Sequence, residues 1–117
     1  SRSMQPKTPK RLEDIRDAAD FIVAVTRGKS LPDYRDDRLL RQAIERNFEI
    51  IGEAMNRLAQ DDPGTASRIS QYRRIIDFRN LLIHGYDLVD HRIVWSTIEE
   101  EVPTLLREVT ALLAESS

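Results

Sequence analysis

The apolar residues of this chain recur at every third or fourth position. From Leu12 to Ile22 they step by three, four and three residues, and from Trp95 to Leu112 the same alternation continues for five steps. This spacing places apolar side chains along one face of an α-helix, whereas a half-buried strand needs a step of two. No segment shows that shorter step. The chain is therefore predicted to be all-α.

Four helices account for the pattern. We predict them over residues 9–27, 36–60, 70–84 and 90–113, with a short extra helical turn within 65–69. The link predicted at residues 28–33 and the other links between these amphipathic helices are short, so they favour an antiparallel up-down four-helix bundle.

Particular residues set the helix ends. Thr8 is expected to cap the first helix, Gly28 to end it in a left-handed conformation, and Asp90 to cap the fourth. Pro103 removes an amide donor and should bend the fourth helix near residues 99–103. In the third helix, the side facing the core is expected to hold Tyr72, Ile75, Ile76, Leu82 and Ile83.

Composition limits the function classes. The 117 residues suit one domain, expected over 8–114, with flexible ends at 1–7 and 115–117; the three residues before Met4 are expected to be a cloning remnant. The chain has no cysteine and two histidines, which excludes thiolate chemistry and argues against a multi-histidine metal site. It has no apolar run long enough to span a membrane, so we expect a cytoplasmic protein. With 18 basic and 20 acidic residues, bulk charge does not favour long nucleic acids.

One polar cluster does not follow from the fold. The predicted third helix ends with Arg79, Asn80 and His84, and Gly85 then separates His84 from Tyr86. Asn80 and His84 share a helix face because they are four positions apart. Arg79 and His84 are five positions apart, which is about 140° around the axis and about 7.5 Å along it. The negative end of the helix dipole favours a protonated His84.

These side chains suit the cleavage of RNA. The 2′-hydroxyl of RNA supplies the nucleophile, so an enzyme needs to move protons and to stabilise the charge on phosphorus. Histidine can act as acid or base near neutral pH, and arginine can bind two phosphoryl oxygens. No metal is required. Two proton carriers serve this reaction best, so we predict a homodimer in which a twofold axis brings both copies of Arg79 and His84 into one cleft.

The same residues also have purely structural interpretations. Arginine and histidine at a helix end are often a cap and a surface pair, and a tyrosine after a glycine often covers a core. We expect His91 to be a first-turn residue without chemistry and the Glu99–Glu101 run to be solvated. Asp77 could orient a neighbouring arginine.

The order Arg79, four residues, His84, one residue, Tyr86 resembles the signature of the HEPN superfamily and specifically of HepT-like toxins. A polar residue after the arginine, here Asn80, is also typical of that family. Two other stretches are similar to the same family: residues 49–54 (Glu-Ile-Ile-Gly-Glu-Ala), and Val94-Trp95 together with residues 102–105 (Val-Pro-Thr-Leu). The resemblance extends over roughly residues 10–113.

This resemblance implies a dimeric helical bundle that acts as a metal-independent ribonuclease without a cofactor. Such proteins are toxins of type II toxin–antitoxin systems, and their partner is an MNT-type nucleotidyltransferase antitoxin. Arg79 and His84 take the positions of the catalytic pair, with Asn80 as a supporting residue. Tyr86 takes the position of the tyrosine that the antitoxin modifies with AMP.

Two residues of the second helix match a family motif without a role that residue chemistry can assign. Glycine within a helix costs about 1 kcal/mol relative to alanine, so we interpret Gly52 as a point of close helix contact. Glu53 could line the dimer cleft or pair with Arg57, and we favour the pairing.

A second function class stays open at this point. The chain could be a helical binding subunit that docks a nucleotidyltransferase or a nucleotide and cleaves nothing. Its acidic balance is compatible with that alternative.

Overall fold

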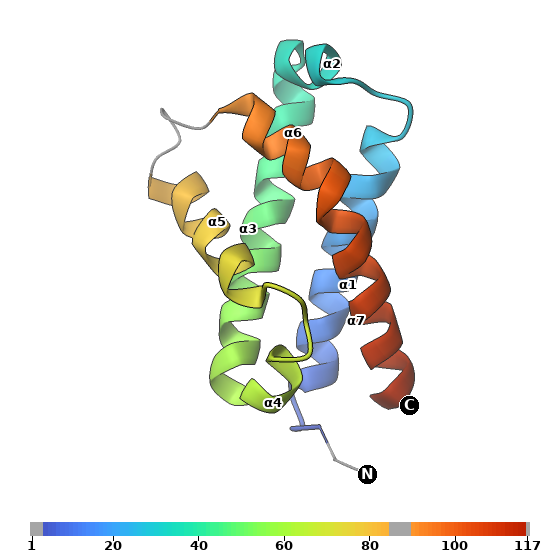
Figure 1. Cartoon of the computed structure of the whole chain (residues 1–117), viewed down its shortest axis with the longest axis vertical. Helices are drawn as coiled ribbons and strands as arrows, with labels where there is room; N and C mark the ends of the chain where they lie inside the picture. The colour runs from blue at the N-terminus through green and yellow to red at the C-terminus, as the bar shows by residue number, and fades with distance from the viewer. Residues whose placement is uncertain (1–3, 85–89, 117) are drawn as a thin grey trace.

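The computed structural model describes residues 4–84 and 90–116, and this part of the chain is helical without strands (Figure 1). The prediction of an all-α fold is therefore confirmed. Its helices are α1 (Thr8–Thr26), α2 (Leu31–Asp36), α3 (Arg38–Asp61), α4 (Pro63–Ala66), α5 (Tyr72–His84), α6 (His91–Glu100) and α7 (Val102–Ser116).

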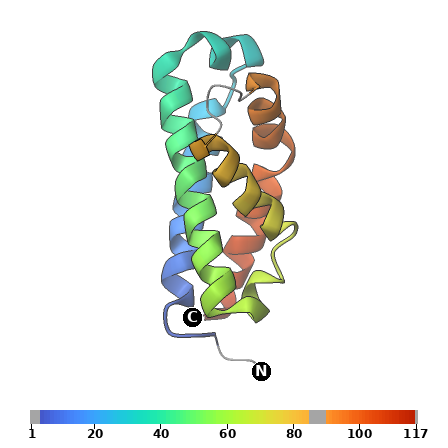
Figure 2. The ribbon, with the colours of Figure 1, turned by 90° about the vertical axis from the view of Figure 1, so that its left-hand side faces the viewer.

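The long helices form the predicted antiparallel bundle. α1 packs against α3 and α7, and α5 packs on α3. Turning the molecule shows that α1, α3 and α7 run nearly parallel to the long axis, while α5 crosses α3 obliquely (Figure 2). None of the described helices is both long and apolar enough to cross a bilayer. Because α5 has α3 as its main neighbour, much of its surface faces outward.

The apolar stripes predicted from the sequence form the core. The stripes of the first and last helices are fully buried, with Leu12, Ile15, Ala19, Ile22, Trp95, Ile98, Val102, Leu105, Val109 and Leu112 all at most 7 % exposed. The predicted bend near Pro103 is a break between α6 and α7 at Glu101. Pro103 is the second residue of α7, where its missing amide proton removes no helical hydrogen bond.

One helix was not predicted. Residues 28–33 were expected to be a link, but α2 begins at Leu31 within it. Ser30 caps this helix: its hydroxyl accepts from the Asp33 amide, and the Asp33 carboxylate accepts from the Ser30 amide at 2.9 Å. α2 buries Tyr34 completely, with its ring centroid 5.7 Å from that of His91 and 5.8 Å from that of Trp95. The sequence did contain a signal for the start of this helix, because a serine is followed three residues later by an acidic residue.

The expected cap of the first helix is wrong. The Thr8 hydroxyl does not accept from its own helix; it donates instead to Asp62 Oδ2 at 2.7 Å, and Thr8 is buried. Asp62 also caps α4, which covers residues 63–66, so the predicted extra turn exists but begins earlier than 65–69. Gly28 ends α1 with φ of +75°, as predicted. Asp90 caps α6 by accepting from the Arg92 amide at 2.8 Å, also as predicted.

The C-terminal helix extends past residue 114, where the domain was expected to end. Glu115 accepts two hydrogen bonds from Arg68, at 2.9 and 2.7 Å. This bidentate pair joins the last turn of α7 to the segment between α4 and α5.

Candidate functional site

The candidate site lies on the last two turns of α5. This helix extends to His84, and its partly buried apolar residues turn toward α3. Asn80 and His84 are exposed, and Arg79 is half-buried. Tyr86 lies outside the described residues, so its predicted place beside His84 stays a prediction.

Arg79 packs directly against the backbone of α3. A Cβ atom added to Gly52 would overlap Arg79 Cβ, and would lie 2.5 Å from Arg79 Cγ and 3.4 Å from Arg79 Cδ. No other residue type leaves this space free. The prediction that Gly52 marks a close helix contact is therefore confirmed, and the residue that it contacts is the predicted catalytic arginine.

The guanidinium of Arg79 has little to bind within the described protein. Its Nη1 donates to Asn80 Oδ1 at 3.2 Å, while its buried Nε has no hydrogen-bond partner. No described carboxylate lies within ion-pair distance of it, whereas Arg74 on the same helix pairs with Glu101. A buried N–H without an acceptor is costly, so this arginine is suited to an anion supplied from outside the chain.

No hydrogen bond joins Arg79 to His84 within the described chain. Among the described groups, no hydrogen bond or ion pair involves the His84 side chain, and it projects into solvent from the last residue of α5. The rotation of about 140° between the two positions keeps them on different sides of the helix. The described chain therefore supplies both predicted catalytic groups, and no hydrogen bond joins them.

Exposed apolar side chains surround these groups. Leu81 is 42 % exposed and Ile83 is 37 % exposed. The expectation that Ile83 faces the core is wrong, because α5 has one main packing partner and its apolar residues cover more of its circumference than α3 can bury. Large apolar side chains beside a polar site are typical of surfaces that contact another molecule.

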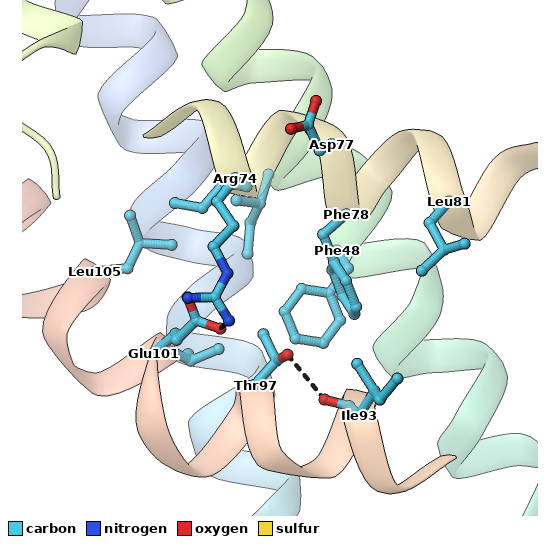
Figure 3. Close-up of a pocket in the computed structure, with 12 residues that line it drawn as sticks. Phe48, Arg74, Asp77, Phe78, Leu81, Ile93, Thr97, Glu101 and Leu105 are labelled. Atoms are coloured by element: carbon cyan, nitrogen blue, oxygen red, sulfur yellow. Dashed lines mark hydrogen bonds and ion pairs between the residues drawn. The ribbon is translucent and has the colours of Figure 1, made fainter. Parts of the chain in front are cut away.

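A groove of about 230 Å³ lies between α5, α6 and α7 (Figure 3), and Leu81 is one of the residues that line it. The edge-to-face pair Phe48 and Phe78 forms part of its wall, with ring centroids 5.0 Å apart. Arg74 and Glu101 form an ion pair at its edge, with Nη2 and Oε2 3.4 Å apart. Arg79, Asn80 and His84 do not line it. The largely apolar walls lack a proton carrier suited to RNA cleavage at neutral pH.

Other residues singled out from the sequence have structural roles. Glu53 pairs with Arg57, with 3.2 Å between Oε1 and Nη2, so the favoured interpretation is confirmed. Asp77 is exposed and makes no ion pair with the arginines of the described chain. Within residues 4–84 and 90–116, no group of three His, Asp or Glu side chains is arranged to hold a metal ion.

Comparison with known proteins identifies a family for this chain. A family described as Ribonuclease HepT-like matches residues 15–112. A protein of Caldanaerobacter subterraneus subsp. tengcongensis, named as a putative RNase, is 36% identical over 92% of this chain and 96% of its own. A probable ribonuclease HepT of Thermococcus cleftensis is 36% identical over 80% of this chain and 84% of its own. Another named putative RNase, from Methanocaldococcus jannaschii, is 29% identical over 84% of this chain and 89% of its own. No solved structure matches the chain significantly.

Proposed function

The chain belongs to the Ribonuclease HepT-like family, and from that membership we propose that it is an RNA endonuclease whose catalytic residues are Arg79 and His84. The observation that carries the proposal is the state of Arg79, whose aliphatic stem packs against Gly52 and whose guanidinium has no acidic partner among the described residues. A phosphodiester of RNA supplies the anion that this group lacks.

The reaction needs two proton transfers and charge stabilisation. His84 in its neutral form accepts the proton of the 2′-hydroxyl, and the oxygen then attacks the adjacent phosphorus. The P–O5′ bond breaks, and a protonated imidazole donates a proton to the departing 5′-oxygen. Arg79 binds the phosphoryl oxygens while their negative charge grows, and Asn80 holds one edge of its guanidinium. This scheme uses no metal ion.

Two proton carriers are best supplied by two chains. We propose a homodimer in which the C-terminal turns of two α5 helices face each other, so that one composite cleft contains Arg79 and His84 of both chains. The exposed Leu81 and Ile83 support this arrangement because they lie on the same turns and would become buried. The absence of a hydrogen bond between Arg79 and His84 within the described chain supports it as well.

The proposal extends to regulation. The protein would be the toxin of a type II toxin–antitoxin pair, silenced when an MNT-type nucleotidyltransferase transfers AMP from ATP to Tyr86. The tyrosine oxygen attacks the α-phosphorus and pyrophosphate leaves. Each AMP adds one negative charge and considerable bulk next to His84 in the sequence, which would repel an RNA backbone. Intact mass after incubation with the transferase and ATP tests this, with Tyr86→Phe as the control that should gain no mass.

Cleavage of RNA in the presence of EDTA tests the enzymatic proposal. The wild-type protein should fragment total RNA, while Arg79→Ala and His84→Ala should lose most activity. The matched controls are Arg74→Ala and His91→Ala, which remove the same residue types away from the site and should cut normally. Equal cutting by wild type and both site variants would point to a contaminating nuclease. An inactive wild type whose mass shows an unmodified chain would refute the proposal and favour a binding subunit.

A further inference from the structure

A polar stripe runs along the outer face of α5 and includes the proposed catalytic histidine. It consists of Arg73, Asp77, Asn80 and His84, which are all exposed and are spaced by four, three and four residues. At 100° per residue they lie within about 60° of one another around the helix. An RNA strand that reaches His84 and follows this face passes over Arg73 at the other end of the stripe.

Arg73 is held in place by a ring rather than by an acid. Its Nε donates to the Tyr72 hydroxyl at 3.1 Å, and its Cζ lies 5.6 Å from the centroid of the Tyr72 ring. Asp77 is one turn further along, yet no ion pair joins the two, and no other described carboxylate is within reach of Arg73. Its full charge is therefore available at the surface.

The neighbouring arginine is arranged differently. Arg74 Nη1 donates to Gln71 Oε1 at 2.8 Å, and its Nη2 lies 3.4 Å from Glu101 Oε2. It faces the groove between α5 and α6, and its charge is largely balanced there (Figure 3). The chain thus offers two adjacent arginines on one helix, one free of acids and one paired.

We propose that Arg73, held by Tyr72, is a second phosphate-binding site for the RNA substrate, separate from the bond that is cut. The inference rests on the proposed function, because it assumes that RNA is the ligand. Eleven residues of helix separate Arg73 from His84, which is about 16 Å along the axis. At roughly 3.4 Å per stacked nucleotide, the phosphate bound by Arg73 lies no more than about five nucleotides from the cleaved one. Arginine beside an aromatic ring is a common arrangement in single-strand binding.

Binding of an RNA that cannot be cut tests this inference without depending on catalysis. The probe is a fluorescent oligonucleotide of about twelve 2′-O-methyl nucleotides, comparable to known single-strand site sizes. Its affinity for wild type, Arg73→Ala and Arg74→Ala is measured by anisotropy at several salt concentrations. Thermal unfolding confirms that both variants are folded.

Arg73→Ala should weaken binding by about two- to tenfold, the loss expected for one net polar contact. The slope of log affinity against log salt should become shallower by about 0.7, which corresponds to one phosphate contact on a single strand. Arg74→Ala should leave both quantities close to wild type. Asp77→Asn should tighten binding, because it removes a negative charge from the middle of the stripe.

Equal effects of the two arginine variants would show a general charge effect and overturn the inference, as would an Arg73→Ala protein that binds like wild type. The proposed function fails separately: if unmodified wild type cuts no RNA in EDTA while binding still depends on Arg73, the phosphate site stands and the ribonuclease assignment does not. Cutting that depends on His84, combined with binding that is indifferent to Arg73, supports the ribonuclease assignment and overturns the phosphate site.

Discussion

Replacing Gly52 with alanine places a methyl group where Arg79 already lies. The added Cβ would overlap Arg79 Cβ and lie 2.5 Å from its Cγ, about 0.9 Å closer than the 3.4 Å at which ordinary contact begins. A change of rotamer cannot relieve the overlap, because the position of Arg79 Cβ is fixed by the backbone of α5. The two helices must therefore separate or rotate.

Two opposing terms set the expected stability. Alanine gains about 1 kcal/mol over glycine in a helix interior, while overpacking a close contact costs about 1–3 kcal/mol. We expect Gly52→Ala to lower the free energy of unfolding by up to about 2 kcal/mol. The displacement also moves the guanidinium, and a shift of about 1 Å in a catalytic group can reduce the rate on the order of a hundredfold.

Urea unfolding followed by circular dichroism measures the first effect, and cleavage of a defined RNA measures the second. The matched control compares Gln42→Gly with Gln42→Ala at an exposed position of α3, where alanine should be the more stable by about 1 kcal/mol. If Gly52→Ala gains the same 1 kcal/mol and cuts RNA at the wild-type rate, the contact with Arg79 does not position the site.

Two further predictions concern the stability of the bundle. Burial raises the pKa of Asp62, but hydrogen bonds from Thr8, Thr65 and the Gln5 amide outweigh it and leave the pKa below its usual value. Asp62→Asn should therefore lower the free energy of unfolding by about 1–2 kcal/mol at pH 7. In urea titrations this difference should shrink as the pH falls through the lowered pKa of Asp62, because the wild-type protein then loses the same hydrogen bonds. A difference that does not depend on pH would contradict the assignment. Burial raises the pKa of Glu45 in the folded state. Ionised Glu45 therefore lowers the stability of the fold above this raised pKa, and the loss is absent below its unfolded-state pKa of about 4.3. Glu45→Gln should accordingly raise the free energy of unfolding at pH 7 and leave it unchanged near pH 4, and a destabilised variant at pH 7 would refute the reasoning.

The sequence was sufficient for most of the bundle because apolar spacing is a local property. The step from Trp95 to Leu112 identified a buried face, and Pro103 located the break within it. Gly52 was recognisable as a contact because a glycine inside a long helix has a cost without local benefit. Its partner was not predictable, since the register of α5 against α3 is set by tertiary packing.

The errors have the same origin. The Thr8 hydroxyl donates to an acid 54 residues away rather than capping its own helix. Ile83 follows the apolar spacing of its helix but is exposed, because spacing gives a face and not the neighbour that covers it. Residues 28–33 were predicted to be a link, although Ser30 and Pro32 are well suited to the start of a helix. The candidate site was proposed from residue types and order, whereas the contact of Arg79 with Gly52 became visible only in three dimensions.

Sharing of the site between two chains is the claim on which the catalytic account depends. Wild-type and His84→Ala chains with different tags can be co-expressed, and the mixed species purified on both tags. Light scattering should give twice the 13.5 kDa of one chain. We predict that this mixed dimer cuts RNA in EDTA at far less than half of the wild-type rate, because its shared cleft keeps only one of the two imidazoles that the reaction uses. A mixed dimer of verified composition that keeps about half of the wild-type rate would contradict the shared site.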